Sequence, residues 1–226
     1  TQSDSFFRNN GTYFEDATVS VGLAAATKRY TRFGVALVDF NNDSRLDLYE
    51  ANGAIGFSRE TLNDQVYAEP DVLLRGLVDF RFKEVQFQGG TQTPLVYTSR
   101  GMAVGDVNND GGLDLLIVNR DGPANLLMNQ ISHQGNWIRF RVLDRHNRDA
   151  HAARVSADLG PIRVTRDVQP AGSYLASNDP RVHLGLGEAT SVSNVSVRWT
   201  DGTLEHFGDF KAGKTAVLRY SEGLAQ

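Results

Sequence analysis

The stretch GMAVGDVNNDGGLDLLIVN, residues 101–119, places Asp106, Asn108, Asp110 and Asp114 at alternate positions of a nine-residue window. On both sides of this window the residues alternate in polarity or are β-branched, as they do in short strands. Asp, Asn and Gly are ordinary turn formers, so a simple turn would explain one such loop. Carboxylates this close together repel one another unless a cation lies among them. The window therefore indicates either a turn or a metal site.

The same pattern occurs a second time in the chain. Residues 32–53, RFGVALVDFNNDSRLDLYEANG, match residues 99–120, SRGMAVGDVNNDGGLDLLIVNR, so that Asp39 aligns with Asp106 and Asp47 with Asp114. Upstream, residues 6–18 are similar to residues 73–85, and a third copy begins at residues 125–130 and stops. An internal repeat predicts a repeated structural unit. Two loops with one oxygen pattern favour the metal site over the simple turn.

Calcium is the cation that this oxygen pattern suits best. Ca²⁺ takes six to eight oxygen ligands, whereas Mg²⁺ prefers a smaller octahedral shell that retains water. We expect one calcium ion in each loop, with side-chain ligands at positions 1, 3, 5 and 9 and a backbone carbonyl at position 7. The expected ligands are Asp39, Asn41, Asp43, Arg45 and Asp47 in the first loop and Asp106, Asn108, Asp110, Gly112 and Asp114 in the second, where Arg45 and Gly112 supply the carbonyls.

An EF-hand is the nearest alternative to a strand–loop–strand calcium site. Glu50 falls at position 12 of the first loop, where an EF-hand has its bidentate glutamate, but the second loop has Ile117 there. The flanking segments are short and β-like, whereas an EF-hand needs amphipathic helices. The sequence therefore favours strand–loop–strand sites, with Glu50 as a strand residue near the ion.

From about residue 134 the sequence reads as a different β domain. Four segments alternate apolar and polar residues, as half-buried strands do: 136–143, 162–168, 192–199 and 215–220. In the third of these we expect Val195, Val197 and Trp199 to face a core and Ser196 and Arg198 to face water. Helical periodicity is scarce, and segment 58–74 is expected to be an inter-strand insertion with room for a short helix. The predicted fold class is all-β.

Composition limits the function and the location. The 226 residues carry a net charge of −4, so no basic field suggests a nucleic-acid partner. No apolar run approaches the ~18 residues of a membrane span. The chain has no cysteine, which excludes disulfides and thiolate metal sites. It starts without Met, as a processed mature protein or a trimmed chain would. Because extracellular calcium modules bind at millimolar calcium, we expect a secreted or periplasmic protein.

The two Asp loops resemble FG-GAP/VCBS repeats, the calcium-binding blade units of integrin-α-like β-propellers. The segments NRDAHAARV (147–155), VQPAGSYLASNDPRVHLGLG (168–187) and VRWTDG (197–202) resemble the ASPIC/UnbV domain of bacterial extracellular proteins and of the cartilage acidic protein family. The resemblance implies two propeller-blade-like units over residues 1–133 and a β-sandwich-like UnbV domain over residues 134–226. It also implies calcium at the Asp and Asn ligands, and it implies no catalytic residues.

Two features depart from these families. Propellers have at least four blades, whereas this chain has two Asp loops and a partial repeat. The chain is therefore expected to be a fragment, to assemble with other copies, or to pack its blades against the UnbV sheet. His151 and Ala152 also stand where the family more often has an aliphatic residue and a glycine.

Two functional classes remain open at this stage. The first is a calcium-stabilised extracellular binding or adhesion module that recognises a protein or a glycan, with a homo-oligomer as an option. An exposed aromatic face would favour it, and the candidates for that face are Tyr49, Tyr67, Phe80, Phe82 and Phe87. The second is a lyase, hydrolase or cyclase of secondary metabolism with a pocket between the repeats and the UnbV domain. Its candidate catalytic residues are His151, His183, Asp149 and Tyr174, which must converge in a buried cleft to act.

Overall fold

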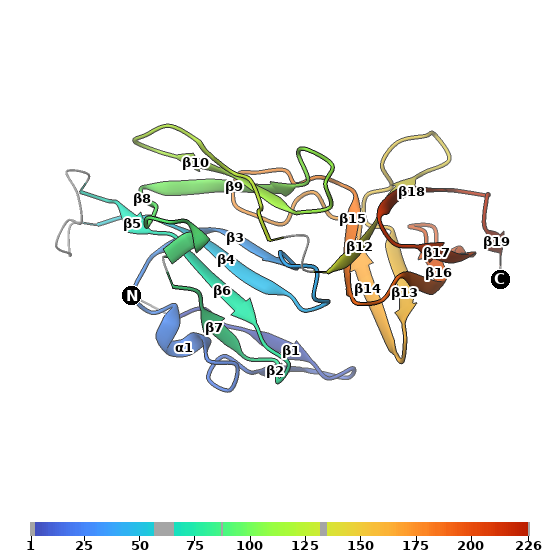
Figure 1. Ribbon diagram of the computed structural model, residues 1–226, viewed down its shortest axis with the longest axis horizontal. Coiled ribbons are helices and arrows are strands. Elements are labelled where there is room, and N and C mark those ends of the chain that lie inside the picture. The colour runs from blue at the N-terminus through green and yellow to red at the C-terminus, as the bar shows by residue number, and fades with distance from the viewer. Residues whose placement is uncertain (1–2, 57–65, 87, 132–134, 226) are drawn as a thin grey trace.

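The computed structural model describes residues 3–56, 66–86, 88–131 and 135–225, and the regular elements in these ranges are almost all β-strands (Figure 1). The described helical elements are the short helix α1 (Leu23–Ala26) and the 3₁₀ turn η1 (Gln88–Gly90). The all-β prediction is therefore confirmed. Within the described ranges, neither helical element is long and apolar enough to cross a membrane. Of the segment 58–74, expected to be an insertion with room for a short helix, residues 58–65 lie outside the described residues. The rest of it contains strand β5 (Glu69–Pro70) and the start of strand β6 (Val72–Gly76), so that part of the prediction is wrong.

Each Asp loop joins the first two strands of an antiparallel sheet. The first sheet has the order β3-β4-β6-β7 and the second the order β11-β10-β9. Leu48 pairs with Leu74 in the first sheet, and Leu115 pairs with Leu127 at the matching place in the second. The partial third copy therefore completes the second sheet. The strands are β3 (Arg32–Val38), β4 (Asp47–Asn52), β6 (Val72–Gly76), β7 (Phe82–Glu84), β9 (Ser99–Gly105), β10 (Asp114–Asn119) and β11 (Asn125–Leu127).

Two smaller pairs of strands extend the first half of the molecule. Strands β1 (Phe7–Asn9) and β2 (Phe14–Asp16) form an exposed hairpin, and β5 (Glu69–Pro70) pairs with β8 (Val96–Tyr97). Strand β4 is buried on both of its faces. Tyr49 packs between the two larger sheets, and Leu48 packs on the other side against Val21 and Leu23 of the N-terminal segment. The first sheet is therefore covered on both faces.

In the second half, two sheets share one core. They have the orders β15-β12-β18 and β14-β13-β16-β17-β19, and β12 runs parallel to β18. Phe140 and Leu184 from the first sheet meet Val155 and Val197 from the second in one apolar cluster. The strands are β12 (Asn136–Leu143), β13 (Arg154–Leu159), β14 (Ile162–Asp167), β15 (Val182–Gly187), β16 (Ser191–Arg198), β17 (Leu204–Lys211), β18 (Lys214–Arg219) and β19 (Leu224–Ala225).

The four alternating segments are confirmed as β12, β14, β16 and β18. Val195, Val197 and Trp199 are buried and Arg198 is exposed, as expected. The prediction that Ser196 faces water is wrong, because this residue is only 2% exposed. The side chain of Arg163, on the same sheet, covers this hydroxyl and donates a hydrogen bond to its Oγ at 3.0 Å.

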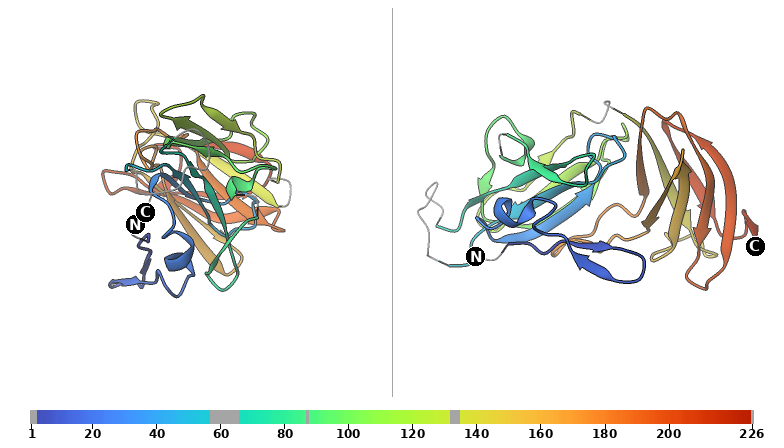
Figure 2. Two further views of the ribbon diagram at one scale, coloured as in Figure 1. Left: turned by 90° about the vertical axis from the view of Figure 1, so that its left-hand side faces the viewer. Right: turned by 90° about the horizontal axis from the view of Figure 1, so that it is seen from below.

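The two halves lie side by side along the longest axis of the molecule (Figures 1 and 2). A segment of the second half, before β15, reaches back onto the strands of the first half. The backbone N–H of Val104 in β9 donates to Asn178 Oδ1 at 2.9 Å, and the N–H of Asp179 donates to Val104 O at 2.8 Å. On β3, the N–H of Val35 donates to Ser173 Oγ at 3.2 Å. This segment ties the halves together beside the Asp loops.

Asp71, just before β6, gives a pH-dependent test of the fold. The side chain is fully buried, and burial raises the pKa of its carboxyl to about 7. Because the folded pKa exceeds the ordinary value of 3.8, the contribution of Asp71 to stability falls as pH rises from about 4 to 7. Asp71→Asn keeps both hydrogen bonds, since the Asn can accept from Asn52 N–H and donate to Ser99 Oγ. We expect it to stabilise the fold at pH 8 by on the order of 1–3 kcal/mol.

Chemical denaturation at pH 4 and pH 8 measures this difference. The gain in unfolding free energy should be small at pH 4, where the carboxyl of the parent is protonated. The exposed Asp79→Asn variant should show little change at either pH. A gain for Asp71→Asn that is equal at both pH values would contradict the assignment.

Candidate functional site

The two Asp loops have the same internal hydrogen bonding. In each loop the first Asp accepts backbone N–H groups from positions 5 and 6, and the last Asp accepts the N–H of position 2. Positions 4 and 6 adopt left-handed backbone conformations in both loops. The φ values are 58° at Asn42 and 71° at Ser44, and 61° at Asn109 and 91° at Gly111. The sequence repeat is thus also a repeat of local structure, between two strands in each case.

The first loop buries several oxygen ligands with little compensation. Asp39, Asn41 and Asp47 are 5%, 3% and 3% exposed. Burial raises the pKa of Asp39 to about 7 and raises that of Asp47, while the backbone N–H groups that each carboxylate accepts work against this. The charge of Asp43 also raises both pKa values. The buried Oδ1 of Asn41 has no hydrogen-bond partner among the described residues. This donor set fits a hard cation.

Two arginines reach the first loop from its solvent side. Arg45 forms an ion pair with Asp43, and Arg75 lies 3.4 Å from the same carboxylate. The side chains of Arg45 and Arg75 are 34% and 52% exposed, so these pairs are screened by water. Arg45 also donates its backbone N–H to Asp43 Oδ1 at 3.0 Å, as Gly112 does to Asp110 at 2.7 Å.

The second loop already has a cation of its own. Asp106 forms an ion pair with Arg139 of β12, and the two side chains are 0% and 3% exposed. The same guanidinium donates to Thr215 Oγ1 at 3.0 and 2.9 Å and to Asn109 Oδ1 at 3.1 Å. Asn108 and Asp110 are exposed at the outer side of the loop. The counter-charge of Asp106 is therefore a guanidinium from the second half.

Neither loop presents a closed set of metal ligands. Within the described ranges, no group of three or more His, Asp or Glu side chains is arranged to hold a metal ion. The carboxylate oxygens of Asp39, Asp47 and Asp106 instead accept backbone N–H groups. Of the two, the first loop fits calcium better, because Asn41 Oδ1 has no partner among the described residues. The arginine that pairs with Asp43 is partly exposed, whereas the arginine that pairs with Asp106 is buried. Calcium stays a prediction in both.

Glu50 lies in strand β4, as the sequence predicts. Burial raises its pKa to about 9. The charged groups that act on it are Asp4, Arg32 and Glu84, none of which belongs to an Asp loop. The flanking elements of both loops are strands, so the EF-hand alternative is excluded.

The second half contacts both loops through strand β15 and the residues just before it. His183 Nε2 lies 2.7 Å from Asn42 Oδ1, and Ser44 Oγ donates to Gly185 O at 3.1 Å. A Cβ on Gly185 would lie 2.0 Å from Asp39 Oδ2, so this close approach requires glycine. Arg181 pairs with Asp179 and also donates to Asn109 Oδ1 at 2.7 Å. The loops are therefore part of an interface inside the chain.

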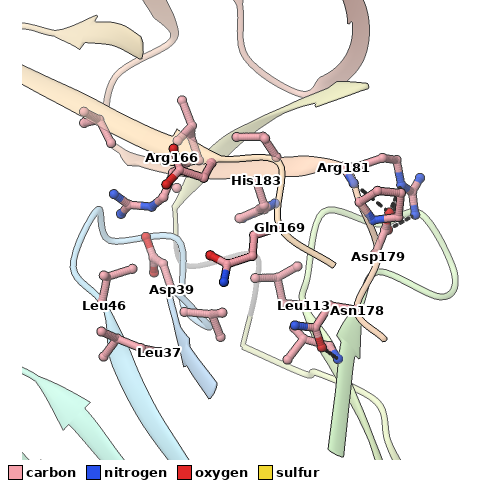
Figure 3. Close-up of a pocket in the computed structure, with 18 of the residues that line it drawn as sticks. Leu37, Asp39, Leu46, Leu113, Arg166, Gln169, Asn178, Asp179, Arg181 and His183 are labelled. Carbon is pink, nitrogen blue, oxygen red and sulfur yellow. Dashed lines mark hydrogen bonds and ion pairs between the residues drawn. The ribbon is translucent and has the colours of Figure 1, made fainter. Parts of the chain in front are cut away.

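A cavity of about 150 Å³ lies at this junction (Figure 3). Asp39, Arg166, Gln169 and His183 line it together with the side chains of several leucines and valines. Burial, assisted by the charges of Arg139 and Arg166, lowers the pKa of His183 to about 3, so its imidazole is neutral. The ring stacks on Trp137, with centroids 6.3 Å apart and an interplanar angle of 19°.

The candidate catalytic residues do not converge in a buried cleft. His183 lies at the junction, whereas Tyr174 is 44% exposed and packs edge-on against Phe33 at 5.1 Å. His151 and Asp149 line an open hollow at the far side of the second half. There Asp149 pairs with Arg141 at 3.0 Å, and His151 contacts it through a backbone hydrogen bond. The arrangement offers no acid–base pair of the kind expected from the sequence.

Sequence reasoning missed the residues that make the junction. Arg139 occupies a polar position of an alternating strand, a pattern that predicts exposure, yet it is 2% exposed. Trp137 and Arg166 carry no signal that could have marked them. Asn42 and Asn109 could have been found, because the repeat places Asn at position 4 of both loops and Asn tolerates the left-handed conformation.

The fold is that of an all-β protein whose two Asp loops lie at the junction of its halves. Comparisons with known proteins show what its second half is similar to. Residues 143–225 match the family described as ASPIC and UnbV. Cartilage acidic protein 1 of Homo sapiens is 28% identical to this chain over 176 residues, which make up 75% of this chain and 25% of that protein. The chain thus spans about a quarter of the length of this relative. The expected likeness to UnbV domains is confirmed, and that to FG-GAP/VCBS repeats stays a prediction.

The buried pair of Arg139 and Asp106 predicts a large stability effect. Arg139→Gln leaves the carboxylate of Asp106 buried and uncompensated, which costs about 3–5 kcal/mol of unfolding free energy. Arg141→Gln on the same strand is the matched control, because its pair with Asp149 is solvent-exposed and contributes about 0–1 kcal/mol. Urea denaturation in EDTA measures both. Equal losses of unfolding free energy in the two variants would contradict a large cost of leaving Asp106 without its partner.

Proposed function

We propose that this chain is a calcium-stabilised extracellular binding module that recognises a protein or a glycan. Residues 1–133 form two blade-like FG-GAP/VCBS units, and residues 134–226 form a β-sandwich-like UnbV domain. The separate apolar cores of the two halves support this division. Because β12 contributes Ile138 and Phe140 to the second core, the boundary belongs before this strand rather than at residue 143.

The observation that carries the calcium proposal is the donor set of the first loop. Three buried oxygen-bearing side chains and the half-buried Asp43 share one tight loop, and Asn41 Oδ1 lacks a partner among the described residues. This oxygen would coordinate a calcium ion, and the ion would neutralise the negative charges of Asp39, Asp43 and Asp47. Arg45 and Arg75 would give up part of their contact with Asp43, which costs little because about a third or more of each side chain is exposed.

In the second loop, calcium competes with a guanidinium. Asp106 is already compensated by Arg139, so an ion there would rely on Asn108, Asp110, Gly112 and Asp114 for most of its binding energy. We therefore propose that the first loop binds calcium more tightly than the second. In both loops the ion has a structural role, since a ligand that binds only the folded state adds RT ln(1 + [L]/Kd) to stability.

Surface recognition is supported by exposed aromatic side chains, although not by the set expected from the sequence. Tyr49 is buried, Phe82 packs against Phe6, and Phe87 lies outside the described residues. Phe80 is 75% exposed, and the hairpin β1–β2 adds further exposed aromatic rings. Aromatic residues are enriched at binding interfaces, so this end of the molecule suits a protein or glycan partner. The exposed aromatic rings of the β1–β2 hairpin are Phe7, Tyr13 and Phe14.

The likeness to an acidic protein of cartilage, as its name describes it, supports a secreted location, and the millimolar calcium found there would fill sites of modest affinity. A homo-oligomer would close the incomplete set of blades. The enzyme alternative has no such support, because its candidate residues His151, His183, Asp149 and Tyr174 do not meet in one cleft.

Calcium titration of thermal unfolding tests the proposal. Calcium should raise the melting temperature of the parent, with a gain of about 2.7 kcal/mol at a calcium concentration 100 times Kd. Asp43→Asn removes a ligand from the first loop and should abolish most of the rise. Asp110→Asn is the matched change in the second loop and should remove less of it. The quantity to compare is the difference between calcium and EDTA in each variant, since Asp43→Asn also loses its arginine pairs.

Light scattering on the same samples gives the solution mass. If Asp43→Asn and Asp110→Asn lose the calcium-dependent rise in melting temperature equally, the proposal that the first loop binds calcium more tightly is overturned. Identical melting curves in calcium and EDTA for the parent would overturn the calcium sites altogether. A mass that increases with calcium would support closure of the blades by other copies, and an unchanged monomer mass would contradict it.

The binding role makes a separate prediction. The parent in calcium should bind members of a panel of glycans and extracellular matrix proteins, and EDTA should weaken this binding because the loops lose their rigidity. The Asp43→Asn variant in calcium should behave as the parent does in EDTA. Surface plasmon resonance measures both. A parent that binds no member of the panel would contradict the proposed function even if calcium stabilises the fold.

A further inference from the structure

We propose that strand β11 is a docking edge for an extended segment of a partner protein, which would add to the second sheet as its fourth strand. The inference rests on the proposed function for the choice of a protein over a glycan, and the contact lies away from the aromatic hairpin. Figure 1 shows β9 and β10 of the second sheet at the upper margin of the molecule and β1 and β2 at the lower margin.

The internal repeat shows what the second sheet lacks. The first sheet has the order β3-β4-β6-β7, whereas the second has the order β11-β10-β9. Strands β6 and β11 hold the same place, since Leu73 lies opposite Tyr49 and Leu126 lies opposite Leu116. Tyr49 and Leu116 also align in the sequence repeat. The position that β7 holds beside β6 therefore has no counterpart beside β11 among the described residues.

The outer side of β11 offers backbone groups to a further strand. In the first sheet the N–H of Val85 donates to Leu73 O at 2.9 Å, so the backbone of Leu73 faces β7. Leu126 holds the matching place in β11, so its N–H and C=O point away from β10. Such groups at a sheet edge can pair with an added strand, and strand addition is a common mode of peptide recognition.

The outer strands of the two sheets differ in charge. Strand β7 carries Lys83 and Glu84, and charged side chains on an edge discourage further pairing. Strand β11 and Met128 after it carry no charged side chain. An uncharged, apolar edge is open to pairing, and proteins usually protect such an edge unless it has a partner.

One face of the second sheet is apolar and open beside this edge. Leu116 and Val118 of β10 are 43% and 50% exposed, and Leu126 and Met128 are 51% and 36% exposed. Because Leu126 lies directly opposite Leu116, both side chains are on the same face. Exposed apolar side chains that gather on one face indicate a contact surface.

The first sheet shows that this face is suited to packing. Tyr49 and Ala51 align with Leu116 and Val118, and they are 1% and 0% exposed because they pack in one cluster with residues of the second sheet. The matching positions of the second sheet are open to solvent. An extended segment beside β11 would direct alternate side chains onto this face, where they would contact Leu126. Apolar side chains at alternate positions are therefore expected in the partner.

Strand β7 gives the direction and the pattern of the added strand. It runs antiparallel to β6 and places Lys83 opposite Arg75. Met128 holds the place of Arg75 in the second sheet, so the partner needs an apolar residue where β7 has Lys83. The next residue on that face matches Val85, which is already apolar. The occupant is therefore an antiparallel segment with the β7 pattern and an apolar residue in place of the lysine.

Fluorescence anisotropy with two labelled peptides tests the inference. The first has the sequence of residues 80–86 with Lys83→Val, and the parent should bind it. The second also carries Val85→Pro and should not bind measurably, because it lacks the N–H that would donate to Leu126 O. The Leu126→Lys variant should bind the first peptide about 10-fold or more weakly, since a charge replaces an apolar contact.

Ile162→Lys is the matched control on the protein. Ile162 is an exposed apolar residue of β14, in the other half of the chain, so this variant should bind the first peptide as the parent does. Light scattering gives the mass of the parent without peptide. A dimer that Leu126→Lys dissociates would overturn the inference, because the edge would then pair with a second copy.

The outcomes separate this inference from the proposed function. No binding of the first peptide, equal binding of both peptides by the parent, or equal binding of the first peptide by the parent and Leu126→Lys would overturn the docking edge. Each of these could occur while the parent still binds matrix proteins through another surface. A parent that binds the first peptide through Leu126 but no member of the panel keeps the docking edge and contradicts the proposed function. Should Leu126→Lys fail to fold, Met128→Lys and the two peptides on the parent decide the question.

Discussion

The ion pair between Arg139 and Asp106 is the interaction on which the rest of the structure depends. Both side chains are buried, and they belong to different halves of the chain. An isolated buried charge is very unfavourable, so neither half can expose its surface here without leaving one group uncompensated. The guanidinium also orders Asn109 and Thr215, which links a loop, strand β12 and strand β18 through one planar group.

The ion pair between Arg139 and Asp106 also makes the electrostatics of the two similar Asp loops different. Their backbones share hydrogen bonds and left-handed positions, and their sequences share Asp and Asn at the same places. In the first loop several oxygens are buried and, within the part of the chain that the structure describes, Asn41 Oδ1 has no partner. In the second loop Asp106 is paired with an arginine. A repeated local structure can thus carry different electrostatics, because the groups that face it come from elsewhere in the chain. The internal repeat predicts equal calcium sites, whereas the tertiary contacts give the two loops different charge compensation.

The junction has polar groups beyond those that hold the halves together. His183 binds Asn42 through one nitrogen and leaves the other without a partner among the described residues, while Arg166 has no ion pair there. Interfaces inside a protein normally satisfy such groups. The polar groups of this junction are therefore satisfied less completely than those of such interfaces usually are.

The sequence by itself determined the all-β class, the four alternating strands of the second half and the strand–loop–strand form of both Asp loops. These depend on local periodicity and on turn residues such as Asn42 and Asn109, whose preferences act over a few neighbours. It did not determine that Ser196 and Arg139 are buried, that Tyr49 is in a core, or that His183 meets the first loop rather than Asp149 or Tyr174. Those outcomes depend on which elements pack together over long separations in the chain. Only the tertiary structure decides them, because burial and charge compensation are properties of the assembled surfaces.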